Sequence, residues 1–118
     1  MKTSQEIAKE IILTHCKRHN IDYQLFFKKW GKRAVKVYNG IHIDWHKQSL
    51  SLYIKDNVDI SNVKLAALLG YNDHTVVAYN TKKFRFLFQQ NDDSIHERYA
   101  DIACWADAMI DELSSEVV

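Results

Sequence analysis

The stretch SNVKLAALLGYNDHTVV, residues 61–77, indicates how this chain folds. Ser61 can cap a helix, because its hydroxyl can accept a hydrogen bond from a backbone N–H, and apolar residues then repeat at helical spacing. Gly70 predicts the end of that helix, since glycine readily adopts the left-handed conformation of a helix cap. Asp73 can cap a second helix directly afterwards. The sequence therefore predicts a helix, a short turn and a second helix over about residues 61–90.

This layout is typical of a helix-turn-helix DNA reader, whose second helix enters the major groove with its N-terminus first. The side chains at the start of the second helix suit base edges. A carboxylate can accept from the cytosine amino group, histidine and asparagine can bond purine edges, and methyl groups can pack on thymine. The candidate base-contacting residues are Asn72, Asp73, His74, Thr75 and Val76. The alternative interpretation is that Asp73 and Thr75 only cap the helix and that His74 is an ordinary surface histidine.

Helical patterns also flank this central pair. Further helices are predicted to begin at Thr3, Asp22, Lys47 and Ser94. The first and the last of these positions are followed three residues later by Glu6 and Glu97, which completes a capping-box pattern. The second helix is expected to run through Trp30 and to close at Gly31, and the third is expected to end near Asn57.

Two apolar patterns concern the C-terminal half of the chain. The last predicted helix carries an apolar stripe at Ile102, Trp105, Met109 and Leu113. The run FRFLF, residues 84–88, could alternate as a strand does. Because residues 75–90 contain no helix breaker, a helix is the favoured interpretation there.

Residues 34–45 follow a different pattern. Apolar side chains alternate with polar ones around an Asn-Gly pair at residues 39–40. Asn-Gly between alternating runs is a strong hairpin signal, because both turn residues must tolerate a positive φ. The sequence predicts a small β-hairpin here. An isolated hairpin is only marginally stable, so we expect it to pack on the helices through Val35, Val37 or Trp45.

The composition agrees with one small, mainly helical domain. The chain has 118 residues, of which 47% are hydrophobic, and it contains three Gly and no Pro. So few turn-forming residues favour long helices over many short strands. We therefore expect a single domain over residues 1–118 of the all-α class, with about five to six helices and the small hairpin near residues 34–45.

Several function classes are not expected. No apolar run approaches the roughly 20 residues that span a membrane, and the N-terminus does not read as a signal peptide. No glycine-rich pattern predicts a nucleotide site, and no spacing places a nucleophile beside a base. Cys16 and Cys104 do not make a disulfide framework. We expect a cytoplasmic, nucleoid-associated protein that is not an enzyme and that binds no cofactor, nucleotide or membrane.

The formal net charge of +1 hides an uneven distribution. Residues 28–47 carry six bases and one acid, whereas residues 92–118 carry one base and eight acids. This asymmetry indicates an anionic partner for one face, and nucleic acid is the commonest such partner. The bases expected to neutralise phosphates from the loop and hairpin are Lys28, Lys29, Lys32, Arg33 and Lys36. The alternative is an ordinary solvated charge cluster.

The segment LGYNDHTVV, residues 69–77, resembles the signature of the C-terminal DNA-binding domain of the bacterial chromosomal replication initiator DnaA, which reads Gly-x-x-Asp-His-Ser/Thr-Thr-Val. The resemblance extends over nearly the whole chain, and its Asp-His-Thr part is the specific one. It implies a TrpR-like helical fold that reads double-stranded DNA in replication or transcription regulation, in a bacterium, a phage or a mobile element. The ATPase module of that family is absent, so we expect a reading domain that stands alone.

The resemblance also implies individual contacts. Base contacts in the major groove are implied for Asp73, His74 and Thr75. The residues that match minor-groove or phosphate positions of the family are Lys47, Gln48, Lys55, Ser61 and Lys83. The chain departs from the family pattern where Asn72 replaces an arginine and Val76 replaces a threonine. The DNA sequence that it recognises therefore need not be the usual initiator box.

A metal site is one alternative interpretation. Metal-capable ligands lie one helical turn apart in two pairs, His15 with His19 and His42 with His46. Neither Cys-x-x-Cys nor His-Glu-x-x-His occurs, so no metal ligands are expected. His15 and its neighbour Cys16 are instead interpreted as half-buried positions of the first helix.

A protein-interaction module is the other alternative. Such a protein would keep the fold but would have lost DNA binding. The acidic last helix and exposed aromatic residues such as Trp105 would then form its docking surface. A protein partner at the acidic helix is also compatible with DNA binding by the basic segment.

Overall fold

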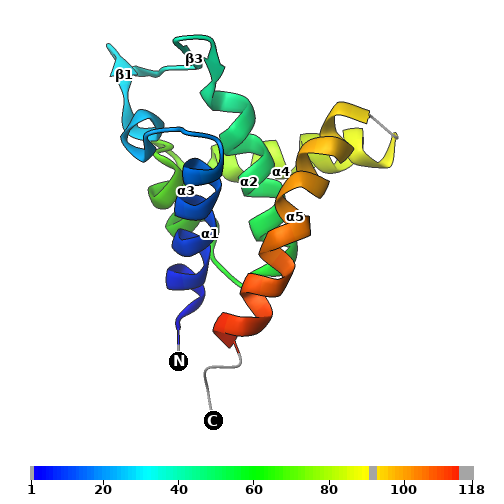
Figure 1. Ribbon diagram of the computed structural model, residues 1–118. Helices are drawn as coiled ribbons and strands as arrows, with labels where there is room; N and C mark the ends of the chain where they lie inside the picture. The colour runs from blue at the N-terminus through cyan, green and yellow to red at the C-terminus, as the bar shows by residue number, and fades with distance from the viewer. Residues whose placement is uncertain (1, 91–92, 115–118) are drawn as a thin grey trace.

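The computed structural model describes residues 2–90 and 93–114, which fold into helices and two small hairpins (Figure 1). The helices are α1 (Ser4–Arg18), η1 (Tyr23–Phe27, a short 3₁₀-helix), α2 (Ile43–Asn57), α3 (Asn62–Leu69), α4 (His74–Gln89) and α5 (Asp93–Ser114). The strands are β1 (Lys29–Trp30), β2 (Arg33–Ala34), β3 (Val37–Tyr38) and β4 (Ile41–His42). The expected fold, mainly α-helical with a small β-hairpin, is confirmed.

Local capping signals set the helix starts that the sequence predicts. Thr3 caps α1 in the expected capping box. The Ser61 hydroxyl accepts from the backbone N–H of Lys64 at 3.2 Å, and the Asp73 carboxylate accepts from that of Thr75 at 3.0 Å. Each such cap satisfies a backbone donor that the helix cannot satisfy itself, which contributes about 1 kcal/mol.

The turn between α3 and α4 depends on Gly70. Its φ of 74° is left-handed, and the N–H groups of Gly70 and Tyr71 both donate to the Ala66 carbonyl. This pairing ends α3 as predicted and satisfies a carbonyl of its last turn. η1 packs directly on the turn, so that a Cβ added at position 70 would lie 2.2 Å from the carbonyl oxygen of Phe26.

α2 lies at the centre of the fold and packs against α3, α4 and α5. Leu50, Tyr53 and Ile54 of α2 have no exposed surface. Full burial of a Leu or Ile side chain contributes about 1.5–3 kcal/mol, so this face anchors the core. Figure 1 shows the hairpins at one end of the molecule, and the start of α1 beside the end of α5 at the other.

The helix predicted from Asp22 is shorter than expected. The chain becomes extended at Lys28, and Trp30 lies in β1 rather than in a helix. Gly31, expected to close the helix, has a φ of 66° and turns the chain so that Trp30 pairs with Arg33. The reason is tertiary, because Phe26 of η1 is fully buried in the core and the chain becomes extended directly after η1.

The hairpin predicted near residues 34–45 is present but narrower. β3 pairs with β4 around the Asn-Gly pair at residues 39–40, and both turn residues have positive φ, 48° and 79°. α2 begins at Ile43, four residues before the predicted start, because Ile43 is buried in the helical core. Of the three expected anchors, Val35 is buried, whereas Val37 and Trp45 are exposed.

α5 begins at Asp93, so Ser94 lies inside the first turn and is not the cap that the second capping box predicts. Asp92 and Glu116, two of the acids counted in this segment, lie outside the described residues. Ile102 is buried as expected, and Trp105 is half-buried. None of the helices in the described ranges combines the length and the hydropathy that a membrane crossing requires.

Candidate nucleic-acid interface

The first turn of α4 presents three of the predicted base-contacting residues to solvent. Asp73, His74 and Thr75 are all exposed. One Asp73 oxygen caps the helix and also lies 3.2 Å from Nδ1 of His74, while Val76 is half-buried. The backbone N–H of Thr75 holds the pKa of the Asp73 carboxyl below its usual value. Asp73 is therefore a charged acceptor next to an exposed imidazole and an exposed hydroxyl.

Asn72 connects this turn to a distant part of the chain. Its side-chain oxygen accepts from Nζ of Lys29, and its Nδ2 donates to the backbone oxygen of Lys32 at 3.5 Å. The predicted role of Asn72 in base contact is thus joined by a second one, since its amide holds the β1–β2 hairpin beside the start of α4. Sequence reasoning missed this role, because no local pattern relates residues separated by about 40 positions.

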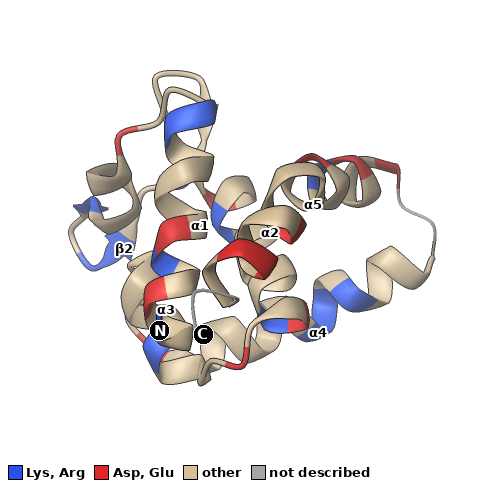
Figure 2. Cartoon of the chain, turned by 60° about the horizontal axis from the view of Figure 1, so that its bottom comes forward, with Lys and Arg blue, Asp and Glu red and all other residues tan. Residues whose placement is uncertain are grey.

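The contacts of Asn72 place the basic β1–β2 hairpin next to the exposed start of α4. The five bases predicted to neutralise phosphates are all exposed, namely Lys28, Lys29, Lys32, Arg33 and Lys36. Figure 2 shows Lys and Arg around β2 and along α4, and Asp and Glu along α5. Because these side chains are exposed, their ammonium and guanidinium groups are accessible to an anionic partner.

The prediction that Lys47 contacts DNA does not fit this structure. Its side chain is only 2% exposed, and Nζ donates to the Phe26 carbonyl at 2.9 Å. The ring of Tyr71 lies below the amine, 4.5 Å from Nζ to the centroid. Lys47 shares the inward face of α2 with Ile43 and Leu50, one helical turn away on either side, which is why it points to the core.

The environment of Lys47 changes its charge. Burial, and secondarily the nearby charge of Lys29, lowers the pKa of Lys47 to about 8. The amine is thus still mostly protonated at neutral pH, where its hydrogen bond to the Phe26 carbonyl is charge-assisted. Lys47 therefore ties α2 to η1, directly under the turn that carries the exposed residues of α4.

The other predicted backbone contacts differ in how accessible they are. Lys83 is exposed on α4, and Gln48 is half-buried on α2. Nζ of Lys55 donates to the Ile60 carbonyl at 2.7 Å, and the hydroxyl of Ser61 is the cap of α3. Lys83 is thus the most available of the four for a phosphate, whereas Lys55 and Ser61 already support the loop before α3.

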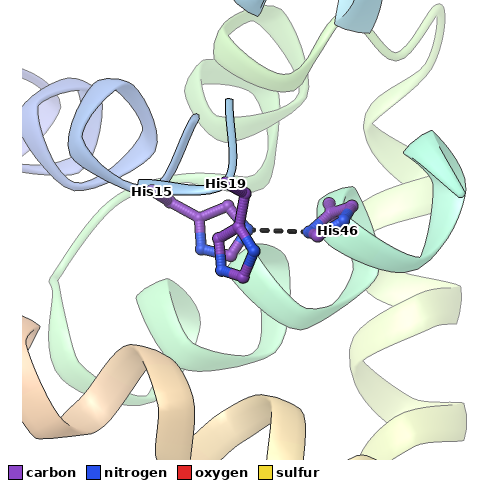
Figure 3. Close-up of side chains that lie close together, drawn as sticks. All are labelled: His15, His19 and His46. Carbon is purple, nitrogen blue, oxygen red and sulfur yellow. Dashed lines mark hydrogen bonds between the residues drawn. The ribbon is translucent and has the colours of Figure 1, made fainter. Parts of the chain in front are cut away.

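A second group of polar residues gathers away from this face. His15 of α1 and His19, which directly follows α1, meet His46 from α2, and the three rings point toward one another (Figure 3). Each ring offers one nitrogen, and these atoms all lie within 4.8 Å of one another. The sequence contains both one-turn pairs, but His42 stacks on Trp45 instead of joining the group. Only the tertiary fold, which places the end of α1 beside the start of α2, brings one member of the second pair to the first.

Comparison with known proteins gave no further guide to function, since no family model, curated protein or solved structure matches the chain.

Proposed function

We propose that this protein binds double-stranded DNA sequence-specifically, with the first turn of α4 in the major groove and the β1–β2 hairpin on the phosphate backbone. The observation that carries the proposal is the pair of contacts from Asn72 to Lys29 and Lys32. They hold a strongly basic element beside the exposed start of a helix that follows a tight turn. Helix-turn-helix proteins likewise use the N-terminal residues of a helix that follows a tight turn to contact base edges.

The exposed side chains of α4 supply the means of reading bases. His74 can bond a purine edge, and the Thr75 methyl group can pack on a thymine methyl. Asp73 can accept from a cytosine amino group, and its negative charge also disfavours close approach to other acceptors. Three residues of different chemistry at one helix start provide the selectivity that a basic surface alone lacks.

The hairpin supplies affinity that does not depend on sequence. Each phosphate that a lysine or arginine neutralises releases condensed counterions, which steepens the dependence of log affinity on log salt by roughly 0.9. The β1–β2 hairpin and the residues on either side of it carry five exposed bases within residues 28–36. The acidic surface of α5 opposes binding in the reverse orientation, since it repels the backbone.

In the proposed role, the protein acts by occupying a specific DNA site. The protein would regulate replication or transcription by holding its DNA sequence, in the cytoplasm and on the nucleoid. The resemblance of residues 69–77 to the DnaA signature supports this role. An interaction of α5 with a partner protein is compatible with it, because the hairpin and the start of α4 form the proposed DNA face.

Binding of a labelled random-sequence duplex tests the proposal. We expect binding at low salt and a loss of affinity of roughly 500-fold between about 50 and 200 mM salt, if about five phosphates are contacted. Fluorescence anisotropy measures this slope directly. An absence of binding at low salt would contradict the proposal and would favour a protein-interaction module of the same fold.

Two lysine substitutions in this experiment distinguish the effect of an exposed hairpin base from that of the buried Lys47. Lys32→Ala should reduce the salt slope by roughly 0.9, because it removes one phosphate contact while the Lys32 backbone oxygen still accepts from Asn72. Lys47→Met should leave the slope unchanged in the folded protein, since its amine is buried against the Phe26 carbonyl. Equal effects of the two substitutions would show that the hairpin is not the phosphate-binding element.

A further inference from the structure

The histidine group between α1 and α2 has the chemistry and the spacing of a metal site. His15 and His19 lie one turn apart at the end of α1, and His46 lies in the first turn of α2. Nε2 of His15 is 2.9 Å from Nδ1 of His46, and the ring centroids of His19 and His46 are 5.0 Å apart. Tetrahedral zinc with Zn–N bonds of about 2.0–2.1 Å requires ligand nitrogens about 3.3 Å apart. Small side-chain rotations therefore suffice to reach that arrangement.

His15 is the member of the group whose position ordinary packing explains least well. Its side chain is only 3% exposed, and its buried Nδ1 has no hydrogen-bond partner among the described residues. A buried polar atom without a partner costs about 1–3 kcal/mol, and most proteins avoid it. His15 is therefore a buried imidazole whose ring faces those of His19 and His46.

Acidic groups from α5 lie beside the three rings. Oδ2 of Asp101 is 2.9 Å from Nε2 of His19, and Asp101 and Glu97 help to line an open pocket of about 170 Å³ at the histidines. A metal-binding histidine commonly donates its other ring N–H to a carboxylate, which orients the ring and raises its basicity. Arg98 also lines the pocket, and its guanidinium lies over the ring of Trp45.

We propose that His15, His19 and His46 bind a divalent transition-metal ion, zinc being the ion that their chemistry favours. Three imidazoles suit zinc and its neighbours, whereas magnesium and calcium prefer oxygen ligands. Cys16 is not part of the site, because its thiol is buried in the hydrophobic core instead of lying with the three ring nitrogens. The ion clamps the end of α1 to the start of α2, and the pocket gives it access to solvent.

Thermal unfolding of the untagged full-length chain with Zn²⁺ tests this site. We expect one equivalent to bind, and the Tm to rise on the order of 10 °C when free Zn²⁺ is about 100 times Kd. EDTA should reverse the rise, and Mg²⁺ at the same concentration should not cause it. Co²⁺ used as a spectroscopic probe should give the intense visible absorption of a four- or five-coordinate site.

Variants decide whether these residues are the ligands. His19→Ala should weaken Zn²⁺ binding by more than the 10–100-fold typical of losing an outer partner, and Asp101→Asn by about that range. His42→Ala is the matched control, because His42 is exposed, lies next to α2 and stacks on Trp45. His42→Ala should bind Zn²⁺ as the wild type does. The proposal is overturned if Zn²⁺ leaves the wild-type Tm unchanged, or if His42→Ala and His19→Ala weaken binding equally.

Discussion

Gly70→Ala is expected to lower the free energy of unfolding by about 3 kcal/mol or more, because two costs meet at this position. The φ of 74° is left-handed, and a residue with a side chain costs about 1–2 kcal/mol there. The added Cβ would also lie 2.2 Å from the oxygen and 2.8 Å from the carbon of the Phe26 carbonyl. Both atoms belong to the backbone of η1, so relief requires the helix and the turn to move apart.

Gly40→Ala provides the matched control for this prediction. Gly40 has a similar φ of 79°, but nothing lies within 4 Å of the position that its Cβ would take. We expect only the conformational cost there, about 1–2 kcal/mol. Urea unfolding of the two variants isolates the contribution of the Phe26 contact. Equal losses of stability would contradict the close packing of η1 on the turn.

His74→Ala and Thr75→Ala are each expected to weaken binding of the recognised DNA sequence by about 1–3 kcal/mol, or roughly 5–150-fold. Both side chains are exposed at the start of α4 and are placed to meet base edges. Neither substitution removes the cap of α4, because Asp73 accepts from the backbone N–H of Thr75. Affinity for random duplex should change little, so the measurement compares the two DNA substrates by anisotropy.

Lys36→Ala is the control in the same assay for a phosphate contact that does not depend on DNA sequence. Lys36 is an exposed base between the two hairpins, and its loss should weaken binding to all sequences alike. The ratio of specific to random binding should therefore stay constant for Lys36→Ala and fall for His74→Ala. If the two variants changed this ratio equally, the division between base contacts and phosphate contacts would be wrong.

Much of the fold follows from local sequence signals. The caps at Thr3, Ser61 and Asp73 and the helix end at Gly70 were all predictable, because each depends on residues within one turn. The Asn-Gly hairpin was predictable for the same reason, since its two turn residues must adopt positive φ. These signals place the start of α4, where the exposed candidate residues lie.

The features that were not predictable depend on packing between distant segments. The β1–β2 hairpin stands where the sequence predicted the end of a helix. Phe26, just before it, is buried in the core, and no local pattern reports that burial. Lys47 has a basic side chain and suggested a DNA contact by resemblance. Its place one turn before Leu50 on the buried face of α2 directs it inward, and Phe26 of the distant η1 supplies the carbonyl that it bonds.

The same distinction applies to the two groups of functional candidates. The residue types at the start of α4 could be identified from the sequence, because they are consecutive. The contact of Asn72 with Lys29 could not, because it joins two separate elements. The histidine pairs were visible as spacings, but only the tertiary fold brings His46 of α2 to His15 of α1. The composition gives only a net charge of +1 and does not show that bases and acids are concentrated in different segments of the chain.

Selection from a random duplex library tests the central claim most directly. The wild-type protein should enrich a defined DNA sequence after several rounds, and His74→Ala should enrich it less strongly or select a different base at one position. The recovered site would also show which bases the start of α4 reads. A library that stays random, although the protein is folded and binds duplex at low salt, would contradict sequence-specific recognition by this helix.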